Sequence, residues 1–339
     1  MRSLSLIAAF GVGLWPGLSA SGPGQVVEEA EEAQPAGLLR LDQIPMPTMG
    51  GKQFWADEFY FHKWRIQRNV FTRHYRLLDE NNWRHCWGTF AECRAALEKI
   101  KRERRLPPMS GKAVILLHGL ADVCSVMDGL ARRLEEKGGW QVFQVVYPST
   151  RESIGDHAKS LAKVIESLEG IEEISFVGYS MGNIVIRRYL GDQTDKARKK
   201  RPDPRIKRMV MIGPPNRGSE LATGLAGSRV FQFVLGKPGL ELGTQWVWEE
   251  RSLAVPRFEF GIIAGGQGND AGLNPLLPGD DDGVVTVAST RLAGASDFLV
   301  VPAFHALLPR SSKVQDCTLR FLEHGYFIAP DRRQPIREE

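Results

Sequence analysis

IEEISFVGYSMGNIVIRRYL, residues 171–190, joins a short strand pattern to a helical pattern through a turn that places Ser180 between two glycines. Residues 174–177 are typical of a buried strand, residues 178–182 of a sharp turn and residues 183–190 of the start of a helix. The two glycines lack the Cβ atoms that would clash where strand and helix come close. Ser180 is therefore expected at the tip of a tight turn, as an exposed nucleophile whose oxyanion is held by the next backbone N–H. The pattern alone is equally compatible with a chance G-x-S-x-G, so its context decides.

The segments on either side of this turn alternate between strand and helix patterns. The strand segments are 113–119, 141–148, 173–178, 208–213, 258–266 and 297–305. The first is a near-continuous apolar run, as expected when both faces of a parallel strand are covered. Ser125 with Asp128, and Ser153 with Asp156, are typical helix starts between them. Repeated units of this kind predict an α/β fold with an open, mostly parallel sheet and helices on both faces.

A serine hydroxyl is a poor nucleophile until a histidine takes its proton and a carboxylate orients that histidine. Open α/β sheets build their sites at the carboxyl ends of the strands, so both partners are expected there. Of the seven histidines, His118 and His305 stand just beyond a predicted strand. A surface loop histidine is the alternative for His305, but its position favours the role of catalytic base.

Four aspartates follow the strand at 258–264 and are candidates for the acid: Asp270, Asp280, Asp281 and Asp282. Asp270 comes soonest after the strand, and the distance along the chain alone favours it. Asp282 precedes a glycine and two valines, where the chain re-enters the core. We therefore expect Asp282 to turn inward toward the histidine while Asp280 and Asp281 stay hydrated, with Asp270 as the alternative.

With these motifs in order, residues from about 113 to 325 resemble the α/β-hydrolase superfamily, in its lipase and esterase branch. LLHGL at 116–120 resembles the His-Gly stretch of the oxyanion turn, and GYSMG at 178–182 resembles the nucleophile elbow. DGVV at 282–285 resembles the acid motif, and GPPNRGS at 213–219 resembles the turn that leads into the lid.

The resemblance assigns a role to each matching residue. It implies a triad of Ser180, Asp282 and His305, with the backbone N–H groups of Leu120 and Met181 as the oxyanion hole. His118 would then shape the oxyanion turn instead of acting as the base.

These features predict a serine hydrolase that cleaves carboxylic esters through an acyl-enzyme. Apolar residues in the insertion at 218–256, a lid in this fold, favour lipid or other hydrophobic esters, although they could instead complete the core. An acyltransferase or thioesterase would use the same triad, and a non-catalytic binding module of this fold is the alternative outside catalysis. We expect no cofactor and no metal, because GGQG at 265–268 lacks a following helix start and DDDG at 280–283 lacks calcium-loop spacing.

Composition limits the partners. The 339 residues are 25% charged and 42% hydrophobic, and the net charge of +4 is too small to indicate a nucleic-acid partner. The basic run at 196–202 is interpreted as a solvated loop. Four cysteines, Cys86, Cys93, Cys124 and Cys317, are too few for a disulfide-built fold and lack zinc-site spacing. Either a Cys86–Cys93 bridge or buried thiols fit the sequence. The sequence makes no prediction of the oligomeric state.

The N-terminal third differs from the rest. Residues 1–20 resemble a secretory signal peptide, which predicts export, with an uncleaved N-terminal membrane anchor as the alternative. Transient contact with a membrane surface is a further alternative. Residues 21–50 are typical of a flexible acidic linker. Residues 51–108 hold eleven aromatic residues, which are expected to be buried or, as the alternative, to form a ligand platform. The same segment predicts two strands joined at 79–82 and a helix that starts with a capping box at Thr89 and Glu92. This aromatic addition is expected to pack on a hydrolase domain at 109–330, followed by a charged tail at 331–339.

Overall fold

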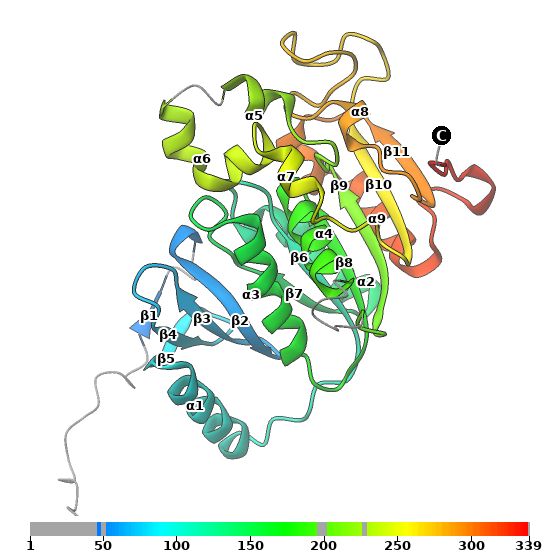
Figure 1. Ribbon diagram of the computed structural model, residues 1–339. Coiled ribbons are helices and arrows are strands. Elements are labelled where there is room, and N and C mark those ends of the chain that lie inside the picture. Colours follow the sequence, from blue (N-terminus) through cyan, green and yellow to red (C-terminus); the bar gives the residue numbers. More distant parts are fainter. Residues whose placement is uncertain (1–45, 49–51, 195–201, 226–228, 338–339) are drawn as a thin grey trace, which may run out of the picture. The chain divides into compact units, whose positions relative to one another are not determined.

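The computed structural model describes residues 46–48, 52–194, 202–225 and 229–337, and all of them belong to one compact unit (Figure 1). The predicted signal peptide, nearly all of the linker and most of the basic run at 196–202 lie outside the described residues, so they stay predictions. Among the described residues, no helix is both long enough and apolar enough to cross a membrane.

A parallel sheet forms the centre of the hydrolase domain. In the described chain it has six strands in the order β11-β10-β9-β8-β6-β7, and every neighbouring pair is parallel. The strands are β6 (Gly111–Leu117), β7 (Gln141–Val145), β8 (Ile171–Tyr179), β9 (Ile206–Ile212), β10 (Glu259–Gly265) and β11 (Asp297–Val301). All six predicted strand segments therefore form, and the predicted open parallel sheet is confirmed.

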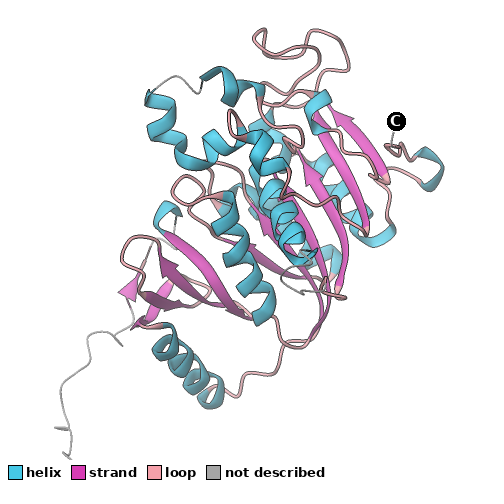
Figure 2. Cartoon of the chain, viewed as in Figure 1, coloured by secondary structure: helices cyan, strands magenta, loops and turns pink. Residues whose placement is uncertain are grey.

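Helices cover both faces of this sheet (Figure 2). The principal ones are α2 (Asp128–Gly138), α3 (Ile154–Ser167), α4 (Met181–Thr194) and α9 (Ser312–His324), with shorter turns at η3 (Cys124–Met127), α8 (Val287–Thr290), η5 (His305–Arg310) and η6 (Pro330–Arg332). Along β6, Ile115 and Leu117 pack in the core cluster of α3 and α4, whereas Val114 and Leu116 pack in the cluster of α2 and α9. Because side chains of a strand alternate between its faces, a strand covered on both faces is apolar throughout.

The predicted helix starts are right in one case and wrong in the other. Ser153 caps α3, and its hydroxyl accepts the Asp156 N–H at 3.1 Å. Ser125 does not start α2, which begins at Asp128 after the 3-10 turn η3. Within this turn Val126 and Met127 are buried in the core cluster of α2 and α9.

The aromatic addition forms a second, antiparallel sheet in the order β1-β5-β4-β3-β2. Its elements are η2 (Lys52–Phe54), β2 (Trp55–Phe61), β3 (Trp64–Asn69), β4 (Tyr75–Leu78), β5 (Trp83–Gly88) and α1 (Phe90–Glu103). The edge strand β1 (Met46–Pro47) pairs with β5, although these two residues were predicted to belong to the linker. The predicted strand pair joined at 79–82 is β4 with β5. The capping box is also confirmed, because the Thr89 hydroxyl accepts the Glu92 N–H at 3.2 Å and the Glu92 carboxylate accepts the Thr89 N–H at 2.7 Å.

The expectation that the aromatic residues of the addition are buried holds for about half of them. The buried ones are Trp55, Phe59, Tyr60, Phe61 and Trp64, and the exposed ones are Phe54, Phe71, Trp83, Trp87 and Phe90. The exposed rings are partly covered by their neighbours: His74 stacks on Trp87 with ring centroids 3.9 Å apart, and the Arg84 guanidinium lies 5.0 Å from the Trp87 centroid. Cys86 on β5 and Cys93 on α1 are both buried thiols, and no disulfide joins them.

The insertion at 218–256 contains α5 (Glu220–Leu225), α6 (Arg229–Leu242) and α7 (Trp246–Glu250). Leu242 and Trp246 are buried in the main core, so this part of the segment completes the core, whereas Trp248 is exposed. The Glu241 carboxylate accepts the Ile154 N–H at 2.8 Å, and Glu249 pairs with Arg188 at 2.8 Å. The second half of the insertion is thereby fixed to α3 and α4.

Candidate active site

Ser180 stands alone between the end of β8 and the start of α4. Its φ of 52° lies in the left-handed region, which a non-glycine residue adopts only when the surrounding structure enforces it. The Ser180 N–H donates to the Ile212 carbonyl at the end of β9, at 2.9 Å. The Asn183 side-chain amide donates to the carbonyls of Ser180 and Ile212 at 3.0 and 3.2 Å. These bonds hold the strained turn and leave the hydroxyl at its tip.

The two flanking glycines are required by close backbone contacts. A Cβ atom on Gly178 would lie 2.8 Å from the Asn183 nitrogen, and one on Gly182 would lie 2.4 Å from the Leu117 carbonyl oxygen. Both distances are shorter than side-chain carbons tolerate, so strand and helix could not approach as they do. This confirms the steric role predicted for both glycines.

His305 reaches Ser180 from the chain that follows β11, the edge strand three places from β8 in the sheet. It begins η5, four residues after β11 ends, and its Nε2 lies 3.0 Å from the Ser180 Oγ. The Tyr179 hydroxyl donates to the His305 carbonyl at 3.2 Å and so fixes the backbone behind the imidazole. Gly213 makes room for the ring, because a Cβ there would come within 3.0 Å of the His305 Cε1.

Asp282 is the aspartate that the structure places against His305. Its Oδ2 lies 2.7 Å from His305 Nδ1. Its Oδ1 accepts the N–H groups of Val284 and Val285 at 3.1 and 2.8 Å, and its carbonyl accepts the His305 N–H at 2.9 Å. The carboxylate is buried, and its orientation is fixed by the three hydrogen bonds that its two oxygens make. A buried anion so placed holds the Nδ1–H tautomer, which leaves Nε2 free to accept a proton.

The neighbouring aspartates differ from expectation. Asp281 was expected to be hydrated but is fully buried, and its carboxylate accepts the N–H groups of Leu273, Asn274 and Gly283. The loop folds back over it, so backbone N–H groups replace water. Asp280 is partly exposed and accepts two further backbone N–H groups, whereas the alternative acid, Asp270, is exposed. The described contacts of His305 thus include Asp282 and none of the other three.

The predicted oxyanion donors lie beside the nucleophile. A Cβ on Gly119 would be 3.0 Å from the Ser180 Cβ, so the turn that continues into Leu120 runs directly against Ser180. Met181 is the first residue of α4, and the first N–H groups of a helix have no acceptor within that helix. Leu120 thus follows a turn that adjoins Ser180, and Met181 follows Ser180 directly in the chain; their role as oxyanion donors stays a prediction.

His118 is buried behind this turn. Its Nδ1 lies 2.9 Å from the Gly119 carbonyl, its own carbonyl accepts a hydrogen bond from the Tyr147 hydroxyl, and its ring stacks on Tyr147 at 4.3 Å. Burial lowers the pKa of His118 to about 4, so the imidazole is neutral at pH 7. The shaping role that the family resemblance implies for His118 stays a prediction, which this buried and neutral imidazole would suit.

Two features of this site escaped the sequence analysis. The Asp122 carboxylate faces the oxyanion turn, 3.4 Å from where a Gly119 Cβ would be, and burial raises its pKa although His305 and Arg310 oppose the shift. Gln53, from the aromatic addition, bonds to the carbonyl of Asp122 at 3.2 Å. Asp122 stands two residues after the His-Gly-Leu motif and could have been noticed, but nothing near Gln53 in the sequence signals its place. Among the described residues, no cluster of three or more His, Cys, Asp or Glu side chains could hold a metal ion.

Comparison with known proteins supports the fold. Residues 141–224, which include the nucleophile elbow, match the family described as "Alpha/beta hydrolase of unknown function (DUF915)". With the parallel sheet and the elbow, this match confirms the resemblance to the α/β-hydrolase superfamily. No curated protein matches the chain in sequence.

Several solved structures resemble this one at low identity. The lin2722 gene product of Listeria innocua is 18% identical over 68% of this chain and 99% of its own, with a TM-score of 0.46. The mature lipase BlEst2 of Bacillus licheniformis is 20% identical over 64% of this chain and 93% of its own, with a TM-score of 0.45. The metagenomic carboxyl esterase MGS0156 is 20% identical over 59% and 66%, with a TM-score of 0.40. Resemblance at this level says nothing about substrate.

Proposed function

We propose that this chain, an α/β hydrolase by its fold, is a serine hydrolase that cleaves carboxylic esters with Ser180 as nucleophile, His305 as base and Asp282 as orienting acid. The observation that carries the proposal is the continuous relay from the Ser180 Oγ to His305 Nε2 at 3.0 Å and from His305 Nδ1 to Asp282 at 2.7 Å. A hydroxyl, an imidazole and a buried carboxylate in this order are the parts that acyl transfer needs.

The chemistry follows from these contacts. The Ser180 Oγ bonds to the ester carbonyl carbon while His305 Nε2 takes the hydroxyl proton. The resulting oxyanion is stabilised by the backbone N–H groups of Leu120 and Met181. When the tetrahedral intermediate collapses, the alcohol leaves with the proton from His305, and Ser180 is left acylated. A water molecule, deprotonated by His305, then releases the carboxylic acid and restores the serine.

Hydrophobic acyl esters are the proposed substrate class. Phe304, Leu307 and Val284 stand next to the proposed base and acid in the sequence and are 55%, 49% and 37% exposed. Exposed apolar side chains beside the relay favour an apolar acyl chain over a charged or small one. The export proposed from residues 1–20 is compatible with such a substrate and is tested by sequencing the N-terminus of the natively produced protein.

The deciding experiment is labelling with a fluorophosphonate probe followed by mass spectrometry of the labelled peptide. We expect the adduct on Ser180, loss of labelling in Ser180→Ala, and turnover of p-nitrophenyl esters that rises with acyl length before it levels off. An unlabelled wild-type protein, or full ester turnover by Ser180→Ala, would refute the mechanism. Transfer of the acyl group to an added alcohol in preference to water would assign the same residues to an acyltransferase.

A further inference from the structure

The oxyanion turn contains a strained residue. Ala121, next to the proposed donor Leu120, has a φ of 59°, in the region that favours glycine. Such a conformation costs on the order of 1–3 kcal/mol and persists only where neighbouring contacts impose it. The Ala121 N–H donates to the Ser149 hydroxyl at 3.0 Å, and Ser149 is fully buried. Ser149 is thus one of the contacts that hold Ala121 in place.

The side chain that completes this arrangement comes from the aromatic addition. The Gln53 Nε2 donates to the Asp122 carbonyl at 3.2 Å and to the Ser149 hydroxyl at 3.1 Å. Its Oε1 accepts the N–H and the hydroxyl of Thr150, each at 3.0 Å. The Gln53 amide therefore links the loop after β7 to the oxyanion turn. It bonds to the Asp122 carbonyl directly and to the Ala121 N–H through the Ser149 hydroxyl. Both polar atoms of Gln53 are used: Nε2 bonds to the oxyanion turn at Asp122 and to Ser149, whereas Oε1 bonds to the loop after β7 at Thr150.

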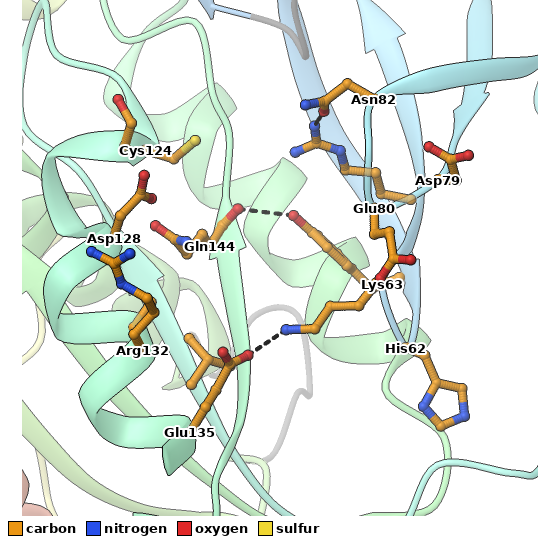
Figure 3. Close-up of a pocket in the computed structure, with 15 residues that line it drawn as sticks. His62, Lys63, Asp79, Glu80, Asn82, Cys124, Asp128, Arg132, Glu135 and Gln144 are labelled. Carbon is orange, nitrogen blue, oxygen red and sulfur yellow. Dashed lines mark hydrogen bonds and ion pairs between the residues drawn. The ribbon is translucent and has the colours of Figure 1, made fainter. Parts of the chain in front are cut away.

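The addition is docked firmly enough to transmit this constraint. The Asp57 N–H donates to the Val146 carbonyl at 2.9 Å, and the Asp57 carboxylate accepts the Val146 N–H at 2.7 Å. Lys63 of the addition also pairs with Glu135 of α2 across the pocket between them (Figure 3). Because β2 is bonded to the chain directly after β7, Gln53 in the preceding turn η2 is held at the loop that contains Ser149 and Thr150.

We infer that Gln53 is a positioning residue for the oxyanion hole, acting through Ser149 and the Ala121–Asp122 backbone on the N–H of Leu120. The aromatic addition then has a role in catalysis and is more than a structural extension. This inference rests on the proposed function, since it presumes that an oxyanion forms beside Ser180. Gln53 touches no reacting atom, so its removal should affect the transition state more than substrate binding.

The test compares Gln53→Met with the wild type on a soluble p-nitrophenyl ester. Methionine keeps the length and flexibility of glutamine but makes none of its hydrogen bonds to Ser149, Thr150 and Asp122. A misplacement of about 1 Å in a catalytic group costs up to about 10²-fold, so we expect kcat to fall tenfold to 10²-fold while KM changes less than threefold. The Ki of a boronic acid transition-state analogue should rise by the same factor as kcat falls.

Three variants make the test specific. Ser149→Ala should reproduce the kcat loss, and the double variant should lose little more than either single one, because both act through one network. Gln53→Glu, which keeps the acceptors for Thr150 but not the donors, should be intermediate. Gln141→Met is the matched control, because it removes a glutamine whose amide bonds to the Ser110 carbonyl far from the site, and its kcat should equal that of the wild type.

The outcomes separate this inference from the proposed function. Unchanged kcat in Gln53→Met, an effect on KM alone, or an equal loss in Gln141→Met would overturn the positioning role while wild-type ester turnover stands. If Gln53→Met does not fold, Ser149→Ala and Gln53→Glu decide the question by the same criteria. If the wild type turns over no ester and Ser180 takes no probe, the proposed function fails first, and the inference fails with it.

Discussion

Replacing Asp282 by asparagine should abolish most ester turnover and leave the fold intact. The carboxylate makes two kinds of contact, which the amide treats differently. Its Oδ1 accepts two backbone N–H groups, from Val284 and Val285, and an asparagine oxygen can accept both. Its Oδ2 faces the Nδ1 of His305 at 2.7 Å, and there the amide would present an N–H donor.

The magnitude follows from the tautomer of the imidazole. A donor at the Oδ2 position forces His305 Nδ1 to accept, so Nε2 carries the proton and can no longer take one from Ser180. A wrong tautomer in a serine triad costs about 10⁴ in kcat, which corresponds to about 5 kcal/mol of transition-state stabilisation. Because the backbone bonds to Oδ1 survive, the free energy of unfolding should change by less than about 1 kcal/mol.

The neighbouring aspartates supply matched controls in the same loop. Asp281→Asn should give the opposite pattern, because its carboxylate accepts three backbone N–H groups and an amide nitrogen accepts none. Loss of at least one charge-assisted bond should cost about 2 kcal/mol of unfolding free energy. Its kcat should remain at least 10²-fold above that of Asp282→Asn. Asp270→Asn, at an exposed position, should change neither quantity.

Two measurements on each variant decide the matter: kcat on a p-nitrophenyl ester at pH 7–8, and the free energy of unfolding from urea titration. The reasoning is refuted if Asp282→Asn retains more than a tenth of the wild-type kcat. It is also refuted if Asp270→Asn is the variant that loses activity, since no described contact links Asp270 to His305. A large stability loss in Asp282→Asn would contradict the division of its contacts described above.

Two further predictions concern stability. Gly182→Ala would place a Cβ 2.4 Å from the Leu117 carbonyl oxygen, so it should lower the free energy of unfolding by at least about 1–3 kcal/mol and abolish ester turnover. Gly224→Ala has open space around its Cβ position and should not lower the free energy of unfolding measured in urea. Burial lowers the pKa of His157 to about 3, so the unfolded chain binds its proton first, and stability falls as pH drops from about 6.5 toward the folded value. His157→Leu should reduce the fall in unfolding free energy between pH 6.5 and 4 by up to about 3 kcal/mol. His324→Leu, at an exposed position, should leave that fall unchanged. Equal pH slopes of unfolding free energy in the two variants would contradict the assignment to His157.

The sheet and the candidate relay could be predicted because their signals are local. Ser180 and His305 each follow an apolar strand, and parallel strands bring their carboxyl ends to one edge. Asp282 was separable from its neighbours because an apolar pair follows it, and of that pair Val285 returns to the core whereas Val284 stays exposed. Each of these positions is marked by the residues directly beside it.

What was missed depends on contacts across long stretches of chain. Asp281 looked like a hydrated loop carboxylate, but residues 273–274 fold back and surround it with N–H groups. Gln53 lies 96 residues from Ser149, and no periodicity relates the two. Backbone donors carry no sequence signature, so a carboxylate or amide that binds them cannot be distinguished from a solvated one without the fold.

The two strained residues of the candidate site are held by different parts of the molecule. Ser180 is fixed from within the sheet, by the Ile212 carbonyl and Asn183, and any protein with this elbow can supply such contacts. Ala121 is fixed from Ser149, which Gln53 of the aromatic addition in turn holds. The nucleophile should therefore tolerate changes in the addition, while the oxyanion turn should not. Variants of the addition would then still take up a small phosphonylating probe on long incubation, although more slowly, because labelling needs a single reaction, while their steady-state turnover of esters falls. Damage to the whole fold would abolish labelling as well.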